Sequence, residues 1–568
     1  MGKGKKILSL LLAVLVLSSM IAGCSGQDSN SGVATSAQPT ATSATASTAT
    51  STAASTGTPA TTTAEPPKEL EGTINVNTSA GVAEVEAWQA VADGYMALNP
   101  KVKVVIDLKP QDGYGDWLKN MLGTANPTAD IVNINQAGLA ATGKQVNFME
   151  YVNNKSPYSN GVWKDQFNFE MQNGIDYGKN TLYNICLSST QVAWFYNKDI
   201  FKKIGVEPPT TWKEFIGICE KLQTAGYQPL AVPGNFNSFW AMQMGWLAQI
   251  YADQTTRSML EVYRAKEGDY NYDPDVDGKF KLDLTNPFND DSWKVNQNTT
   301  RAYVAVRDGV YKPDSEGMKT VMSQLKEIFP KYAGGDAFFG TDDAGWISLF
   351  YQNKAAIALD TVARLAYFKN DMDKIEAGQP FKLNSKTVKG VQKFELGSFN
   401  MPSMEGAGIE APARTIEVAQ GFLGAVKKEK AHDDLVVDFF MYLSSKEGYS
   451  KYLSGQLKGG GVPNGPSLVY GVELPGEYEA MYKDLKFIGN CQKGCGQLMA
   501  RGAPCDIQES LREWYGYTQE FFTGKITVDQ WGEKHKTNVM KYIFKDSIKA
   551  AHINLSDLDN PANAPTGE

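Results

Sequence analysis

Apolar and polar residues are ordered over residues 72–134 in a way that predicts strands separated by helices. Strands are expected at 72–78, 101–108 and 129–134, where apolar side chains alternate with polar ones or form short runs. The helix expected after the first strand has apolar residues on one face: Val82, Val85, Trp88, Val91, Tyr95 and Leu98. A second helix is expected over 117–122. Strands that alternate with helices favour a mostly parallel sheet covered on both faces, so the predicted fold class is α/β.

The loops after these strands are the first candidates for a binding site. Ligands of open parallel sheets bind beyond the carboxyl ends of the strands. In this chain the rule selects the loops at 77–80 and 133–138.

Residues 196–230 carry the clearest local pattern. A strand end turns into a short helix, and the two prolines at 208–209 hold the following segment extended. Thr211 and Glu214 stand three residues apart, which is the spacing of a capping box, and predict the start of a new helix.

The first residues predict export and attachment to a membrane. Three lysines precede an apolar run at 7–20 that is too short to span a bilayer comfortably, so residues 1–23 read as a signal peptide. Ile-Ala-Gly before Cys24 resembles a bacterial lipobox, in which the cysteine carries the lipid and becomes the mature N-terminus. The alternative is a cleaved soluble signal with an incidental cysteine. Residues 24–67 are mostly Ser, Thr and Ala, which predicts a disordered tether at the extracellular face of the cell membrane.

Size and charge narrow the class of protein. About 500 residues follow the tether, too many for one core, so at least two lobes are expected. The net charge of −8 without long runs of either sign argues against nucleic acid as a partner and against a polybasic membrane patch. The chain has only three histidines and no nucleophile, metalloprotease, phosphate-loop or dinucleotide motif, which argues against an enzyme, although carboxylate pairs stay available.

The cysteines beyond Cys24 are five, which excludes a fully paired disulfide framework. Cys219 falls on the apolar face of the predicted helix after Thr211, as a core thiol would. Cys491, Cys495 and Cys505 share a glycine-rich loop, where one disulfide or a zinc site are the alternatives to free thiols.

Several segments, in the same order, resemble the extracellular solute-binding proteins of ABC importers, the family that includes maltose- and oligosaccharide-binding proteins. The resemblance covers about residues 72–545 and rests on these segments: 196–230, 350–360 (FYQNKAAIALD), 400–404 (NMPSM), 417–424, 432–448, 459–464 (GGGVPN) and 524–531 (GKITVDQW). It implies a two-lobed periplasmic-binding-protein-like fold of the type II clamshell kind, with the ligand between the lobes.

The resemblance also implies where the chain divides. Crossings between lobes are expected near 188–191, 356–360 and 417–421. The first lobe would then take residues 68–189 plus 358–417, and the second residues 190–357 plus 418–568 with the C-terminal helices.

The function implied is that of a monomeric substrate-binding lipoprotein, not an enzyme. It would capture a carbohydrate, expected to be an oligosaccharide, and deliver it to the permease in the membrane. The alternatives are a surface-anchored carbohydrate-active enzyme and a sensory or adhesive lipoprotein with the same fold.

Candidate ligand-binding residues lie at strand ends, at crossings and in a polar-aromatic loop. They are Asn135 and Gln136 after the third strand, Thr190 and Gln191 at the first crossing, Asn237, Phe239 and Trp240 in the loop, and Asp360 and Arg364 at the second crossing. The family often has Gly and Trp after that second crossing, where this chain has Asp360 to Ala363, so Trp346 and Trp514 are added as substitute rings. For each aromatic residue the alternative is a core position, and for each polar residue a turn or cap.

One acidic loop has the spacing of a calcium site, within residues 255–311, which depart from the family pattern. Asp273, Asp275, Asp277 and Gly278 give the D-x-D-x-D-G order, whereas Leu284 stands where a bidentate Glu belongs. A structural calcium ion and a solvated acidic turn are the alternatives, and no other cofactor is expected.

Overall fold

The computed structural model describes residues 69–567 apart from short gaps at 80–81, 111–112, 135–142, 173, 176–179, 242, 292, 384–385, 475–477, 483–484 and 502–507. The signal peptide, Cys24, the tether, Asn135, Gln136 and Cys505 therefore lie outside the described residues.

The first sheet has four strands in the order β11-β3-β1-β2. Its members are β1 (Gly72–Val76), β2 (Val102–Ile106), β3 (Ile131–Asn133) and β11 (Leu423–Ala425). Strand β1 pairs in parallel with β2 and β3, and β11 is antiparallel to β3. The three strands expected from the sequence are confirmed, and so is the parallel pairing.

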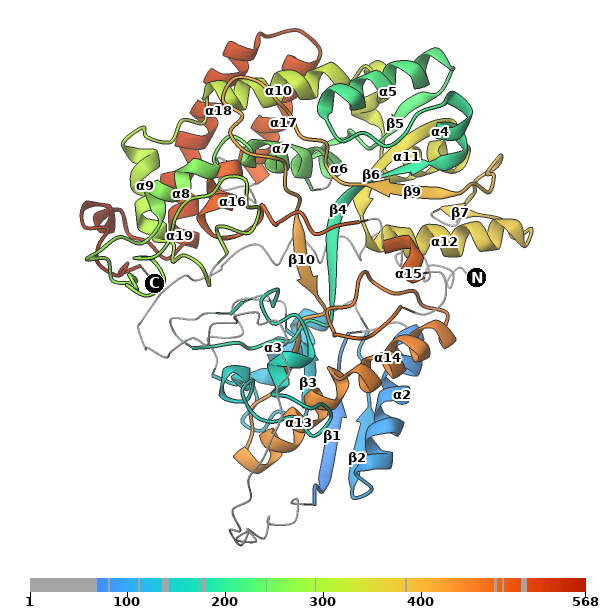
Figure 1. The fold of residues 1–568 in the computed structure, drawn as a ribbon, viewed down its shortest axis with the longest axis vertical. Helices are drawn as coiled ribbons and strands as arrows, with labels where there is room; N and C mark the ends of the chain where they lie inside the picture. Colours follow the sequence, from blue (N-terminus) through green and yellow to red (C-terminus); the bar gives the residue numbers. More distant parts are fainter. Residues whose placement is uncertain are drawn as a thin grey trace, which may run out of the picture.

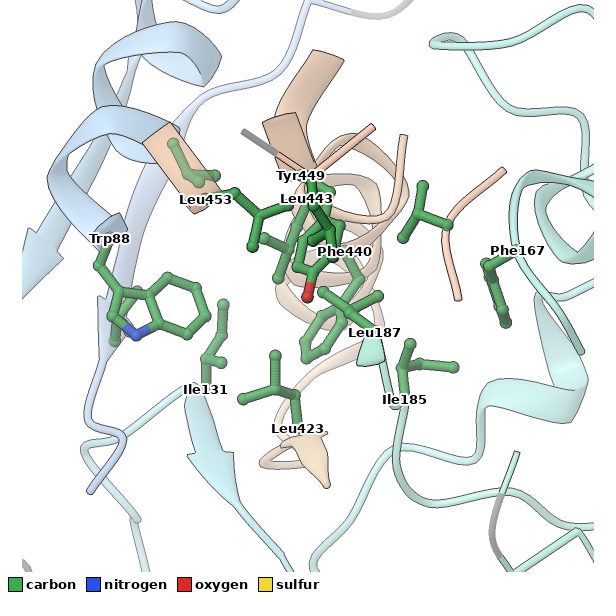
Figure 2. Close-up of a cluster of buried hydrophobic side chains, with 14 of the residues drawn as sticks. Trp88, Ile131, Phe167, Ile185, Leu187, Leu423, Phe440, Leu443, Tyr449 and Leu453 are labelled. Carbon is green, nitrogen blue, oxygen red and sulfur yellow. The ribbon is translucent and has the colours of Figure 1, made fainter. Parts of the chain in front are cut away.

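Four helices complete the first lobe, defined here as this sheet with α2 (Val82–Leu98), α3 (Tyr114–Leu122), α13 (Lys430–Leu443) and α14 (Lys446–Lys458). Helix α14 packs along α2. The approach is close because α14 carries Gly455, where an added Cβ would lie 2.4 Å from the carbonyl oxygen of Glu86. Figure 2 shows the core of this lobe, in which Trp88, Ile131, Leu423, Phe440 and Leu453 bring α2, β3, β11, α13 and α14 together. Each such side chain stabilises the fold by about 1.5–3 kcal/mol through burial.

The second sheet is built around the long strand β4 (Ser188–Asn197). Its order is β10-β4-β6-β5, with β5 (Gln228–Ala231), β6 (Ala355–Thr361) and β10 (Glu417–Gln420), and β9 (Leu396–Phe399) also pairs with β4. Strands β7 (Lys382–Leu383) and β8 (Lys386–Thr387) form a separate hairpin. The parallel pair β5–β6 places two carboxyl ends at one edge.

The second lobe is this sheet with the remaining helices. They are α4 (Lys198–Ile204), α5 (Trp212–Thr224), α6 (Phe236–Ala241), α7 (Gln243–Asp253), α8 (Leu260–Tyr263), α9 (Thr299–Arg307), α10 (Glu316–Ile328), α11 (Asp343–Tyr351), α12 (Ala363–Glu376), α15 (Tyr478–Tyr482), α16 (Gly494–Arg501), α17 (Gln508–Phe522), α18 (Val528–Tyr542) and α19 (Ile548–Ala550). The capping box predicted at Thr211 and Glu214 is present at the start of α5, and Cys219 is buried in the core as expected.

Strands β4 and β10 run between the two lobes (Figure 1). The first half of β4 pairs with β10, with Gln191 opposite Glu417, and its second half pairs with β6 and β9. The chain passes between the lobes a third time between α14 and α15 (Figure 1). The crossings expected near 188–191 and 417–421 thus coincide with β4 and β10.

The structure corrects the rest of the expected division. Strand β6 is not a crossing, because all seven of its residues are buried and it pairs with β4 and β5 inside the second sheet. Residues 363–399, assigned to the first lobe from the sequence, carry α12 and β9 of the second lobe. Strand β11 and helices α13 and α14, assigned to the second lobe, pack with the first sheet. Hydrogen-bond pairing decides these placements, and apolar periodicity does not contain that information.

Among the described residues, Cys219, Cys491 and Cys495 are buried free thiols, and Cys186 is also buried. A disulfide between Cys491 and Cys495 is therefore not formed, because the sulfur of Cys491 faces Gln249 and that of Cys495 faces Thr299.

Candidate functional site

The carboxyl edge of the first sheet carries a set of polar side chains that hold its loops in place. The amide of Asn77, just after β1, donates to the backbone oxygen of Asp107 at 3.0 Å and to its carboxylate at 3.2 Å. The side-chain oxygen of Asn133, at the end of β3, accepts from the backbone N–H of Ser79 at 2.8 Å. The amide of Asn133 donates to the oxygen of Gly421, directly after β10, at 2.9 Å. The edge therefore lies against the end of the crossing strand.

A half-buried tryptophan lies beside this edge. Trp117 is on α3, with its ring 5.4 Å from the ring of Tyr114 and 5.4 Å from the amine of Lys109. Lys109 pairs with Asp107 at 2.6 Å. The hydroxyl of Tyr114 donates to the oxygen of Asn77 and accepts from the N–H of Asn133, which anchors α3 to the sheet. Burial raises the pKa of Tyr114, so the hydroxyl keeps its proton.

The carboxyl edge of the second sheet carries a charged cluster. Asp360, at the end of β6, accepts from the guanidinium of Arg364 at 2.8 Å and from the N–H of Thr361 at 2.7 Å. Asp343, in the first turn of α11, accepts from Ser238 and from the indole of Trp346, both at 3.2 Å. Burial raises the pKa of Asp343, and the charge of Asp360 adds to the increase. For Arg364, burial lowers the pKa but the charge of Asp360 outweighs it.

The loop after β5 is held tightly next to this cluster. The N–H groups of Gly234 and Asn235 both donate to the oxygen of Thr341, at 2.9 and 3.1 Å. A side chain at Gly234 would collide with the backbone of Phe338, because an added Cβ would lie 2.2 Å from its oxygen. The loop therefore fixes the start of α6 so that Ser238 contacts Asp343.

The edge of the second sheet also meets the crossing. Thr361 is opposite Val192 in the β4–β6 ladder, and the N–H of Val362 donates to the oxygen of Gln191 at 2.8 Å. Since Asn133 of the first sheet contacts Gly421 at the other end of β10, both sheets direct carboxyl ends towards the ribbon made by β4 and β10.

The sequence-predicted residues fall into three groups in the structure. In the first group, Asp360 and Arg364 lie close to Asp343, and Thr190 and Gln191 lie in the crossing. The hydroxyl of Thr190 is buried without a hydrogen-bond partner, and the amide of Gln191 donates to Asn400 at 3.0 Å.

The second group consists of aromatic side chains in the interior. Phe239 and Trp346 are fully buried and Trp514 is 7% exposed. The ring of Phe239 lies 5.2 Å from that of Trp514 and 6.3 Å from that of Phe338. These positions match the core alternative for the three rings.

The third group is separate from these contacts. Asn237 is exposed on α6, and Trp240 belongs to the same helix, although its side chain is not described. Asn135 and Gln136 fall in the gap at 135–142.

Sequence reasoning missed Asp107, Lys109, Trp117 and Asp343. Asp107 lies at the end of the second predicted strand, Lys109 directly after it, and Trp117 at the start of the next predicted helix, so the carboxyl-end rule applied to that strand would have drawn attention to this part of the chain. Nothing in the sequence ties Asp343 to Asp360 and Arg364.

The carboxylates of the acidic loop at 273–278 form hydrogen bonds and an ion pair with neighbouring residues. Asp277 accepts from the N–H groups of Asp273 and Asn296 at 2.8 and 2.7 Å, and Asp275 pairs with Lys279 at 2.9 Å. Asp273 accepts from the N–H of Asp275 at 2.8 Å. Within the part of the chain that the structure describes, no group of three or more His, Cys, Asp or Glu side chains is arranged to hold a metal.

The fold and the site define a class of protein: two α/β lobes joined by strands, with the carboxyl edges of both sheets directed at the joint. The chain belongs to the bacterial extracellular solute-binding proteins, because the model of that family matches residues 79–449. Its members are binding proteins, not enzymes. None of the helices in the described residues is long and apolar enough to cross a membrane.

Solved structures share this fold at low sequence identity. The apo form of RafE from Streptococcus pneumoniae aligns with a TM-score of 0.52 at 15% identity, over 84% of this chain and 98% of RafE. A family 1 extracellular solute-binding protein from Bifidobacterium longum subsp. infantis aligns with a TM-score of 0.50 at 16% identity, over 83% of this chain and 99% of that one.

Proposed function

We propose that this chain is the solute-capturing subunit of an ABC importer, that its cargo is a carbohydrate of the oligosaccharide class, and that it releases the cargo unchanged to a permease. The observation that carries the proposal is the convergence of both carboxyl edges on the β4–β10 ribbon. The four paired residues of β10 separate the two edges by roughly 13 Å. That spacing suits a small solute held between lobes.

The chemistry of the two edges suits sugars. Each sugar hydroxyl both donates and accepts hydrogen bonds, and charged side chains that reach the surface at the first edge, such as those of Asp107 and Lys109, can hydrogen-bond with them. The partly exposed ring of Trp117 can cover the apolar C–H face of a pyranose. A second RafE structure has raffinose bound, and the fold shared with RafE supports the same class of cargo here.

Binding of a carbohydrate to the native state is expected to raise the melting temperature of the full chain. At a ligand concentration one hundred times Kd the native state gains about 2.7 kcal/mol by mass action. A thermal-shift screen over raffinose, stachyose, malto-, xylo- and chito-oligosaccharides tests this. Trp117→Ala is expected to weaken binding of the active sugar about tenfold, because a stacking contact is lost.

Trp293→Ala is the matched control for the tryptophan. Trp293 is 39% exposed, lies in the section at 255–311 and has the amine of Lys294 4.4 Å from its ring. Trp293 resembles Trp117 because it is also a partly exposed tryptophan with a lysine amine near its ring. It differs in lying away from both sheet edges. Affinity that falls equally in both variants, or an unchanged affinity in Trp117→Ala, contradicts the proposed site. Hydrolysis of the bound sugar would favour the carbohydrate-active enzyme instead.

We also propose that the chain is held at the extracellular face of the membrane by a lipid on Cys24, which would leave a monomeric binding protein next to its permease. The proposal is supported by the lipobox-like Ile-Ala-Gly-Cys order and the tether composition. Cys24→Ser is expected to move the protein from the membrane fraction to the medium. Retention of this variant in the membrane fraction contradicts the anchor.

A further inference from the structure

A segment of the second lobe lies beside residues 415–417, at the start of the crossing strand β10, on the side opposite β4. This segment, residues 486–493, leads from α15 into α16. The N–H of Thr415 donates to the oxygen of Gly489 at 3.0 Å, and the N–H of Cys491 donates to the oxygen of Thr415 at 2.9 Å. On the other side, the N–H of Val192 in β4 donates to the oxygen of Ile416 at 2.9 Å. The start of β10 is therefore held from both edges.

One buried carboxyl group joins β10 to this segment. Glu417 is 5% exposed, and its carboxyl oxygen accepts from the N–H of Ile488 at 3.3 Å. Its own N–H donates to the side chain of Asn490 at 3.2 Å. Glu417 is also the residue of β10 that pairs with Gln191 of β4, so it stands where all three extended segments meet.

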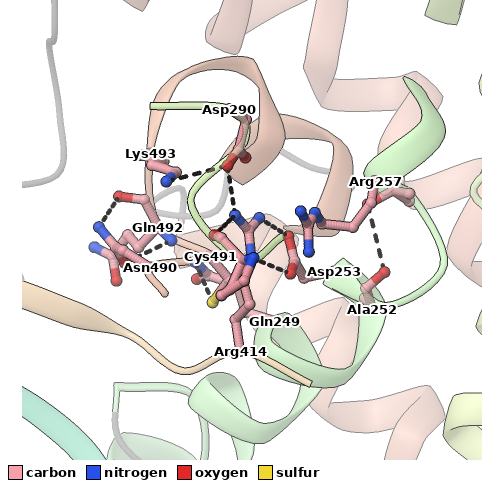
Figure 3. Close-up of polar contacts among 12 residues, drawn as sticks. Gln249, Ala252, Asp253, Arg257, Asp290, Arg414, Asn490, Cys491, Gln492 and Lys493 are labelled. Carbon is pink, nitrogen blue, oxygen red and sulfur yellow. Dashed lines mark hydrogen bonds and ion pairs between the residues drawn. The ribbon is translucent and has the colours of Figure 1, made fainter. Parts of the chain in front are cut away.

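The charged groups around Glu417 do not neutralise it. Those that face it are Lys493 and Asp291, and these two form an ion pair with each other. Lys493 also pairs with Asp290 at 3.1 Å (Figure 3). Burial raises the pKa of Glu417 from an ordinary 4.5 to about 7. Hydrogen bonds from the N–H groups of Ile488 and Gly489 and the charge of Lys493 oppose that increase, whereas Asp291 adds to it.

We propose that Glu417 is a proton-controlled clasp that holds the 486–493 segment on β10 when its carboxyl group is protonated and loosens it when the group is ionised. Because β10 connects the lobes, the clasp would regulate the site between them. This last step rests on the proposed function.

The direction of the pH effect follows from proton linkage. When the segment separates from β10, water reaches Glu417 and its pKa returns towards 4.5, so the separated state binds fewer protons than the packed state. Raising the pH therefore favours separation, by up to about tenfold per pH unit between the two pKa values, and the effect levels off above pH 7.

Hydrogen exchange on the full chain without ligand tests the clasp. Exchange of the amides in 487–491 is measured from pH 5 to 8 in the wild type and in Glu417→Gln, which keeps an acceptor for Ile488 but cannot ionise. The wild-type rate divided by the variant rate cancels the intrinsic pH dependence of exchange. This ratio is expected to rise more than tenfold between pH 5 and 7.

Asp438→Asn is the matched control. Asp438 is a carboxyl group on α13 of the first lobe whose pKa is also raised by burial, and it accepts from Tyr95 at 2.7 Å and Tyr158 at 2.5 Å. This variant is expected to keep the wild-type exchange profile at 487–491. A flat ratio for Glu417→Gln, or an equal change in Asp438→Asn, overturns the proposal.

Two further features keep the test decisive. If Glu417→Gln does not fold, the wild type alone answers the question, because exchange at 487–491 must rise with pH relative to exchange in the buried strand β6. The exchange experiment uses no ligand, so its result does not depend on sugar binding. If no sugar binds in the thermal-shift screen, the proposed function is rejected but the proposed clasp is not. Bound sugar with flat exchange rejects only the clasp.

Discussion

Arg414→Met is expected to lower the free energy of unfolding by about 3–5 kcal/mol, the range for removing one partner of a buried ion pair. Arg414 is 1% exposed and just precedes β10 (Figure 3). Its guanidinium donates to both carboxylate oxygens of Asp253, at 2.8 and 2.6 Å, and to Asp290 at 2.7 Å. The substitution leaves two buried carboxylates without their main cation. Urea unfolding at neutral pH measures the loss.

Two controls separate the lost ion pairs from lost packing. Adding Asp253→Asn and Asp290→Asn to Arg414→Met is expected to recover part of the stability, because the buried charges that caused the loss are removed as well. Arg307→Met removes an arginine whose partners Asp308 and Asp559 are exposed, and is expected to change little. A loss below about 1 kcal/mol for Arg414→Met would show that water reaches the cluster.

The Arg414 cluster illustrates what the sequence could not predict. Asp253 and Asp290 lie 161 and 124 residues from Arg414 along the chain. With 55 basic and 63 acidic residues, no spacing rule selects these three. Local signals behaved differently: the capping box at Thr211 and Glu214 depends on residues three apart, and the structure confirms it.

Strand partners were the second limit of sequence reasoning. The family resemblance implies a crossing near 356–360, but an interior strand and a crossing strand look alike in composition. Only the ladder to β4 and β5 shows that β6 belongs to the second sheet. The same ambiguity placed β11 in the wrong lobe, because its antiparallel partner β3 lies almost 300 residues earlier.

Candidate site residues could be predicted from the sequence where a charged side chain lies at the end of a strand. Asp360 lies at the end of β6 and Arg364 just after it, and the two form an ion pair at 2.8 Å. Phe239, Trp346 and Trp514 were chosen for ring chemistry alone, and the interior of the second lobe needs the same rings. Trp117 was overlooked even though it begins the helix predicted after the second strand.

Substitution of Asp130, in the first lobe, is the other change expected to lower the free energy of unfolding strongly. It is fully buried just before β3 and accepts from Lys428 at 2.5 Å, from His432 at 2.6 Å and from the N–H of Asn75 at 2.7 Å. These contacts join β1, β3 and the start of α13. Asp130→Asn removes the buried negative charge that faces Lys428 and His432, and it is expected to lower the free energy of unfolding by about 2–4 kcal/mol. The loss should be smaller than for Arg414, because Lys428 and His432 are 24% and 21% exposed.

The cost of Asp130→Asn should depend on pH in one direction. Burial alone would raise the pKa of Asp130, but hydrogen bonds from His432, Lys428 and Asn75 outweigh it and hold the pKa below its ordinary 3.8. The stabilisation is therefore complete above pH 3.8 and is lost as the pH falls through the lower folded value. Urea unfolding should show a gap between wild type and variant that narrows in strong acid, as the pH falls below 3.8. Asp434→Asn, which removes a half-exposed partner of Lys430 on the same helix, serves as the control. A gap that stays the same down to the most acidic folded conditions would mean that Asp130 stabilises the lobe through packing, not through its charge.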